Sequence, residues 1–155
     1  MPLTLHLATP SDAARIAEIH MAAFGSNSML LAQFPTPAVR TALQSSIERK
    51  ALDDMNDPKT SVLVVRDSDL GKDVQNEEPD TSDGSGEIIS FAKWSHPILE
   101  GEEHSEPPWV WPEGTRMDIL EKWGNKLEEA QEKVLSGAPC YRKNQNFQRS
   151  DILDY

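Results

Sequence analysis

Cysteine is nearly absent from this chain of 155 residues, because Cys140 stands alone. A single thiol excludes an internal disulfide and favours a reducing, intracellular setting. No run of about 18 apolar residues occurs, so we expect no membrane span. The amino end also lacks the basic stretch and long apolar core of a signal peptide. The composition therefore predicts a cytoplasmic protein.

Basic residues are also scarce. The chain has 15 Lys and Arg against 26 Asp and Glu, which gives a formal net charge of −11. Such a balance argues against binding to nucleic acid, whose phosphates need cationic partners, and against docking on anionic membranes. The acidic residues gather in 67–87 and 100–106, and we expect these runs to be solvated loops. The histidines show no metal-ligand spacing, so no metal is expected.

Alternating apolar residues and helix-capping patterns predict one α/β domain. We expect strands at 3–7, 61–66 and 87–94, helices at 9–25, 36–57 and 115–137, and a loop or short helix at 26–35. The stretch 67–86 has almost no apolar residue, so it predicts a mobile hairpin insert that joins two antiparallel strands. A second polar loop is expected at 97–114. Residues 140–142 are typical of the start of a last strand.

Several segments resemble the GNAT family of N-acetyltransferases. The similar segments are 5–13 and 16–24 for the first strand and helix, and 62–66 and 88–94 for the next two strands. The phrase Phe91-Ala92-Lys93-Trp94 and the loop 107–112 are similar to a fungal subgroup of that family. The resemblance implies a partial GNAT-like domain at 1–142, with a small antiparallel sheet and helices packed on it. It leaves a non-family polar tail at 143–155.

The sequence departs from the family where the coenzyme would bind. GNAT enzymes have a Gln/Arg-x-x-Gly-x-Gly/Ala turn at a helix start, whose backbone N–H groups hold the pyrophosphate of CoA. Glycine is needed there because a Cβ would block the close approach of phosphate to backbone. No glycine follows Gly137, and Gln145 and Arg149 stand without the motif. By resemblance we expect a truncated domain that keeps the acceptor side and lacks the CoA side, from an alternative exon or a truncated gene copy.

The resemblance implies an activity, the transfer of an acetyl group from acetyl-CoA, as co-substrate, to the amine of a small molecule. It places the acceptor between the first two helices. The substrate-binding residues that follow from this are Phe24, Asn27, Phe34, Trp94, Trp109 and Trp111. Two nearby residues, His96 and Glu100, are the candidates for the catalytic base. The two tryptophans of the loop either cover an exposed sheet face or line the acceptor pocket.

Other interpretations stay open. The chain is an acetyltransferase, or it is a non-catalytic GNAT-like fragment that binds a small molecule or a partner. A sheet edge left open by missing strands predicts a homodimer or aggregation. An unrelated fold with the same strand order is the third alternative.

Overall fold

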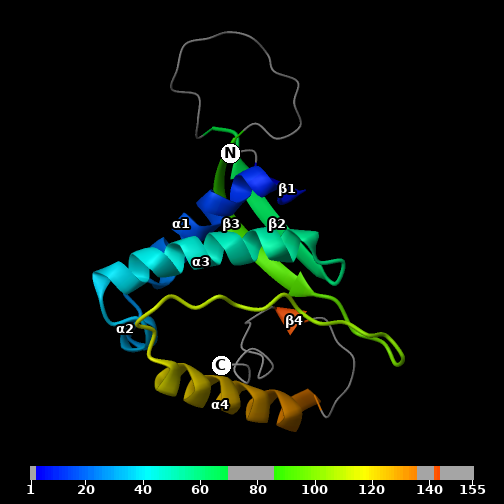
Figure 1. The fold of residues 1–155 in the computed structure, drawn as a ribbon. Helices are drawn as coiled ribbons and strands as arrows, with labels where there is room; N and C mark the ends of the chain where they lie inside the picture. Colours follow the sequence, from blue (N-terminus) through cyan, green and yellow to red (C-terminus); the bar gives the residue numbers. More distant parts are fainter. Residues whose placement is uncertain (1–2, 70–85, 136–141, 144–155) are drawn as a thin grey trace.

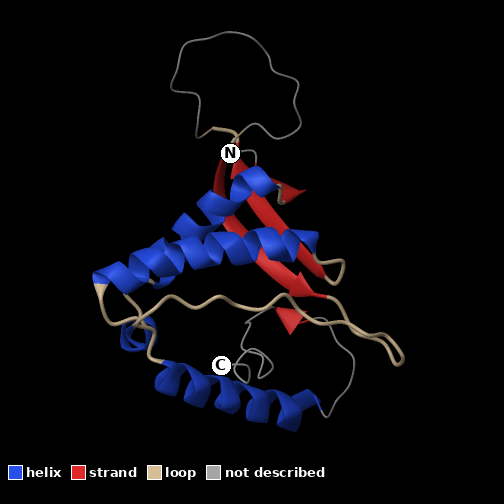
Figure 2. Ribbon diagram, in the orientation of Figure 1, coloured by secondary structure: helices blue, strands red, loops and turns tan. Residues whose placement is uncertain are grey.

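Four strands form one antiparallel sheet, and helices pack on it, as the sequence predicted. The computed structural model describes residues 3–69, 86–135 and 142–143. Its elements, in chain order, are β1 (Leu3–Leu7), the 3-10 helix η1 (Pro10–Asp12), α1 (Ala13–Phe24), α2 (Ser28–Gln33), α3 (Pro37–Asn56), β2 (Thr60–Asp67), β3 (Glu87–Ser95), α4 (Met117–Leu135) and β4 (Arg142–Lys143). Figure 2 shows the same elements by type. None of the helices described is long and apolar enough to cross a bilayer.

The strands lie in the order β1-β2-β3-β4, each antiparallel to its neighbour. The predicted antiparallel pairing of β2 and β3 is confirmed, and a register shift follows Val65. Strand β4 includes Lys143, which pairs with Trp94. The strand thus includes Arg142 of the predicted start and continues into the first residue of the predicted tail. Most of the predicted insert and tail, 70–85 and 144–155, lies outside the described residues, as does Cys140.

Side-chain caps fix where the helices begin. The backbone N–H of Thr9 donates to the Asp12 carboxylate at 2.8 Å, as the predicted capping box requires. The Thr36 hydroxyl accepts the N–H of Val39 at 3.2 Å at the start of α3. The segment 26–35, which was expected to be a loop or a short helix, contains the helix α2. The sequence thus located two helix starts, at Thr9 and Thr36, by their local chemistry.

Helices α1 and α3 cover one face of the sheet (Figures 1 and 2). Alternate side chains of a strand point to opposite faces, so only one set of β2 residues can meet these helices. The core on this side consists of Ala13, Ile16, Ala51, Val62, Val64 and Ile88. Burying such side chains contributes about 1.5–3 kcal/mol for each large one. This core holds α1 and α3 to the sheet.

The opposite face of the sheet carries apolar side chains in contact with solvent. The alternation of Leu3, Leu5 and Leu7 correctly predicted β1, and these leucines are 54%, 65% and 68% exposed. Trp94 of β3 is 40% exposed. It pairs with Ser61, which alternates with the buried Val62. These residues therefore share the face that α1 and α3 leave uncovered.

A second core cluster joins the helices to one another. Its buried members are Ala17, Leu30, Phe34, Leu43, Ile47 and Leu120, from α1, α2, α3 and α4 and the residue after α2. Trp109, Trp111 and Met117 pack against it. The segment between β3 and α4 runs alongside α3 to reach this cluster (Figure 1). The loop 97–114 is thereby attached to the helical side of the molecule.

Gly114 has a conformation and a position that a larger residue does not fit. Its φ is +86°, and an added Cβ would lie 2.9 Å from Val39 Cγ2. Gly101 is a matched control, because its φ is +87° and nothing lies within 4 Å of the added atom. We expect Gly101→Ala to cost about 1 kcal/mol in unfolding free energy through backbone strain, and Gly114→Ala to cost more. Denaturant unfolding measures both, and equal losses would contradict the contact with Val39.

Candidate active site

The predicted base His96 lies on the uncovered face of the sheet. Its Nε2 is hydrogen-bonded to Ser61 Oγ at 2.8 Å. Ser61 and Trp94 both point away from the helices, as described above. Glu100 is exposed in the following loop. His96 therefore lies on the opposite side of the sheet from α1, which carries the predicted acceptor residue Phe24.

The three predicted residues near α2 have different environments. Phe24 is 50% exposed at the end of α1. The side chain of Asn27 is exposed, and its Oδ1 accepts the N–H of Met29 at 2.8 Å, so it caps α2. Phe34 is 4% exposed and belongs to the second core cluster. Asn27 thus has a structural role at the start of α2, and its predicted contact with a ligand stays a prediction.

Phe34, Trp111 and Trp109 form a continuous set that we call the aromatic row. The rings of Trp109 and Trp111 are stacked, with centroids 4.7 Å apart and an interplanar angle of 5°. The Phe34 ring lies 6.0 Å from that of Trp111. Both tryptophans pack on the helical cluster. Whether they cover a sheet face or line an acceptor pocket stays a prediction, since Trp109 also contacts Lys93 of β3.

Lys93 stands at the Trp109 end of the row. Its Nζ is 5.8 Å from the centroid of a Trp109 ring, within the range of a cation–π interaction. Lys93 pairs with the buried Val62 across the sheet and therefore points toward the helices. Its ammonium also donates to Asp54 Oδ2 at 2.5 Å. The row thus begins at a cation whose charge a carboxylate already neutralises.

His20 lies on the same side of the sheet. Burial lowers its pKa, and the positive charge of Lys93 lowers it further. Its ring is 5.1 Å from that of Phe24. An imidazole with a lowered pKa is neutral at neutral pH and can accept a proton. His20 was predicted only to be one of the histidines that bind no metal. Its helical spacing from the buried residues Ile16 and Ala17 is the signal that indicates a buried position.

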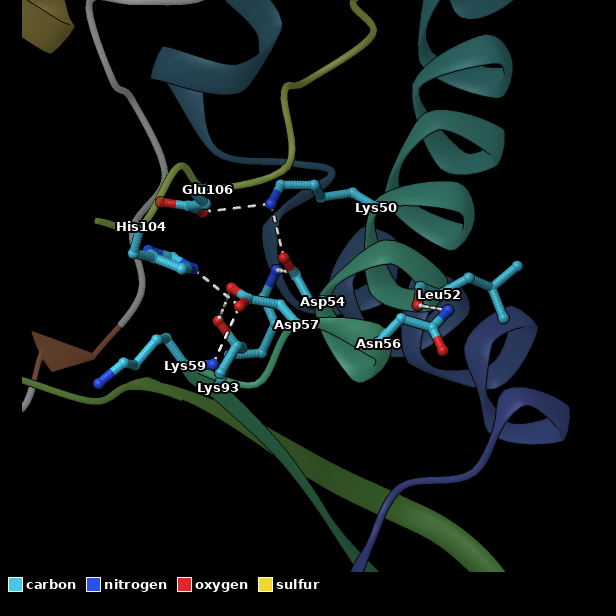
Figure 3. A network of polar contacts seen from close by, with 10 residues as sticks. Lys50, Leu52, Asp54, Asn56, Asp57, Lys59, Lys93, His104 and Glu106 are labelled. Carbon is cyan, nitrogen blue, oxygen red and sulfur yellow. Dashed lines mark hydrogen bonds and ion pairs between the residues drawn. The ribbon is translucent and has the colours of Figure 1, made fainter. Parts of the chain in front are cut away.

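Lys93 belongs to a buried ionic network, which Figure 3 shows. Asp54 is fully buried and accepts hydrogen bonds from Lys50 Nζ and Lys93 Nζ, both at 2.5 Å. Lys50 is 2% exposed and also donates to Glu106 at 3.1 Å. Two ammonium groups therefore face two carboxylates. The expectation that the acidic run 100–106 is simply solvated was wrong for Glu106, which is 14% exposed in this ion pair.

A second part of the network holds the loop to the end of α3. Burial raises the pKa of Asp57, but hydrogen bonds from the Lys59 backbone, His104 and Thr60 lower it more, so that the pKa falls below its usual value. His104 Nε2 lies 2.8 Å from Asp57 Oδ1. Lys59 Nζ donates to Glu102 Oε2 at 2.6 Å. These contacts tie the residues that follow β3 to the residues that precede β2.

Two neutral, buried N–H donors have no hydrogen-bond partner within the described part of the chain. They are Nε2 of Gln33 and Nε1 of Trp109. Gln33 is 5% exposed and precedes Phe34, and its backbone oxygen accepts the N–H of Arg116 at 2.8 Å. A buried donor without a partner costs about 1–3 kcal/mol. These donors are therefore candidates for binding an oxygen acceptor.

No protein-family model and no curated protein matches the chain. A solved structure from Corynebacterium glutamicum ATCC 13032, described as histone acetyltransferase HPA2 and related acetyltransferase, is similar to it. The sequence identity is 20%, and the similarity covers 82% of this chain and 72% of that chain with a TM-score of 0.45. Similarity at this level carries no argument about activity. The function of this chain has to be argued from its own residues.

Proposed function

We propose that the chain is a GNAT-like acyltransferase that transfers an acetyl group from acetyl-CoA to the amine of a small molecule. One observation carries the proposal. His20, a neutral base in a partly buried position, lies near Lys93, and Lys93 faces the aromatic row on the helix-covered side of the sheet. The order of strands and helices that resembles the GNAT family supports the same assignment.

His20 replaces His96 and Glu100 as the base in this proposal. Acyl transfer forms a bond between the acceptor nitrogen and the acyl carbon, and it breaks the bond from that carbon to the thioester sulfur. The nitrogen loses one proton, and the sulfur leaves as a thiol after gaining one. His20 would accept the proton from the nitrogen, because its imidazole is uncharged. Phe24 and the aromatic row would hold the apolar part of the acceptor.

We assign no described residue to the coenzyme. Gly114 has a positive φ and lies three residues before α4. The N–H groups of Thr115, Arg116 and Met117 after it already donate to the carbonyls of Pro112, Gln33 and Thr115. A pyrophosphate needs free backbone N–H groups at a helix start. Within the described residues, the beginning of α4 does not offer them.

Acetyl-CoA binding is tested by thermal unfolding of the full chain with and without the coenzyme. Ligand at about a hundred times its dissociation constant adds about 2.7 kcal/mol of stability. For a domain of this size we expect a rise in Tm of roughly 5–10 °C. Release of free CoA in the presence of an amine then measures acetyl transfer.

The alternative is a non-catalytic protein that binds a small molecule at the same site. The missing Gln/Arg-x-x-Gly-x-Gly/Ala motif after Gly137 favours it. A cooperative transition that acetyl-CoA leaves unchanged, together with no release of CoA, would reject the acyltransferase and leave the binding protein. Absence of any cooperative transition would contradict both functions.

A further inference from the structure

We propose that residues 102–113, which we call the strap, form a lid that lifts from the end of α3 and admits small solutes to the buried ammonium groups of Lys50 and Lys93. The strap lies between Gly101 and Gly114 and runs alongside α3 (Figure 1). The inference goes beyond the proposed function. It requires only the strap and the ionic network, so it holds whether or not the chain transfers an acetyl group.

Polar side chains fasten the first half of the strap, and they alternate along it. Residues 102, 104 and 106 each contact the segment 50–59. The pairs are Glu102 with Lys59 at 2.6 Å, His104 with Asp57 at 2.8 Å, and Glu106 with Lys50 at 3.1 Å. Charged groups that separate regain water, which offsets much of the attraction that they lose. Such contacts therefore release more readily than apolar packing of the same extent.

The two ends of the strap differ in how firmly they are held. At Gly101 the φ is +87° and nothing lies within 4 Å of an added Cβ, so this residue is free to turn. Near the other end, Trp111 packs on the second core cluster. The proline pair 107–108 follows the last ion pair and stiffens the backbone, since proline fixes φ. Residues 102–106 therefore lift as a unit about Gly101, while Trp111 stays packed.

The closed strap shields the two ammonium groups. Lys50 is 2% exposed, and Glu106 of the strap lies against it, as Figure 3 shows. The side chain of Lys93 is 15% exposed, and Trp109 of the strap lies beside it. Closing the strap also buries Nε1 of Trp109, which has no hydrogen-bond partner within the described residues. A buried donor of this kind destabilises the closed form, because water would satisfy it in an open form.

Opening is measured on the full chain by brief acetylation of lysines with acetic anhydride, followed by mass spectrometry of peptides. Lys126 is exposed and reports the rate of a freely accessible amine. Lys50 reacts only when the strap lifts or the whole chain unfolds, so its rate relative to Lys126 gives the fraction of open molecules. We expect Lys50 to react at least about tenfold faster than global unfolding, measured with denaturant, allows. A rate at the limit set by global unfolding would overturn the proposal.

Two variants test which contacts hold the strap closed. Glu102→Gln combined with His104→Ala removes two of the three pairs and keeps the contact of Lys50 with Glu106. It should raise the rate at Lys50 about tenfold or more and leave that at Lys126 unchanged. Glu103→Gln is the matched control, because it neutralises an exposed residue between the two, and it should leave the rate at Lys50 unchanged. Equal rates at Lys50 in the two variants would contradict the proposed fastening.

Salt tests the same contacts without a substitution. The pair of Glu102 and Lys59 is 38% and 25% exposed, so salt screens it. Raising the salt concentration should therefore increase the rate at Lys50 relative to that at Lys126 in the parent protein. The increase should be lost in the double variant. A parent rate that does not depend on salt would count against the proposal, whether or not the double variant folds.

Discussion

Replacing Asp54 by alanine lowers the free energy of unfolding by about 3–5 kcal/mol, because the loss of one partner from a buried ion pair leaves an uncompensated charge. Asp54 is 0% exposed and accepts from both Lys50 and Lys93, so two ammonium groups lose their carboxylate. For a chain of this length the change corresponds to a fall in Tm of roughly 6–20 °C. Calorimetry of the variant and the parent protein measures it.

The control is the exposed pair of Arg116 and Asp118, in which both side chains are 54% exposed. Exposed pairs contribute little to stability, so Asp118→Ala should leave the Tm nearly unchanged. Adding Lys50→Met to Asp54→Ala should restore part of the loss, because it removes one of the unpaired ammonium groups. If Asp54→Ala lowered the Tm as little as Asp118→Ala does, the result would contradict a buried ionic network around Asp54.

The elements that the sequence predicted well are those specified by local chemistry. Alternating leucines predicted β1, and the Thr36 side chain predicted the start of α3. The capping hydrogen bonds join residues at most three positions apart. Such contacts depend only on residues close in sequence. A local sequence pattern is therefore enough to predict them.

The candidate site depends on contacts that no local pattern shows. Glu106 and Lys50 are 56 positions apart, and their pairing requires the loop after β3 to return along α3. The same return places Trp109 near Lys93. Glu106 was expected to be part of a solvated acidic run, because no pattern in the sequence predicts that path of the loop.

Strand and helix periodicity does predict on which face of its element each of the two histidines, His96 and His20, lies. His96 follows Trp94 by two positions at the end of β3, and this spacing puts both on the uncovered face. His20 follows Ile16 by four positions, which puts it on the buried side of α1. His96 was predicted as a base because it was expected near the acceptor site. Strand and helix periodicity would have favoured His20.

Replacing His20 by glutamine should reduce kcat/KM for acetyl transfer about 100-fold or more, the lower end of what a general base contributes. Glutamine keeps a polar side chain but cannot take up a proton at neutral pH. In the parent protein the rate should fall as the pH drops through the lowered pKa of His20, since the protonated imidazole no longer accepts the proton. This acid limb should disappear in the variant. Initial rates from pH 5 to 8 test both points.

The stability of the protein gives a second test of the same pKa, independent of activity. The pKa of His20 in the folded chain lies below the ordinary value of 6.5, so the unfolded chain takes up the proton first. The contribution of His20 to the free energy of unfolding should therefore be fully present above pH 6.5. It should be lost as the pH falls from 6.5 to the pKa of His20 in the folded chain. The buried carboxylates Asp12 and Asp57 have pKa values below 3.8, so their stabilisation is lost only at lower pH.

His6→Gln is the matched control, since His6 contacts the neighbouring Thr4 on the edge strand β1. This variant should keep both the rate and the pH dependence of the parent protein. If His20→Gln loses the stability slope below pH 6.5 but keeps full activity, His20 is a buried neutral histidine and not the base. If it keeps the slope, the environment that burial and Lys93 create for His20 is contradicted, and the proposed active site with it.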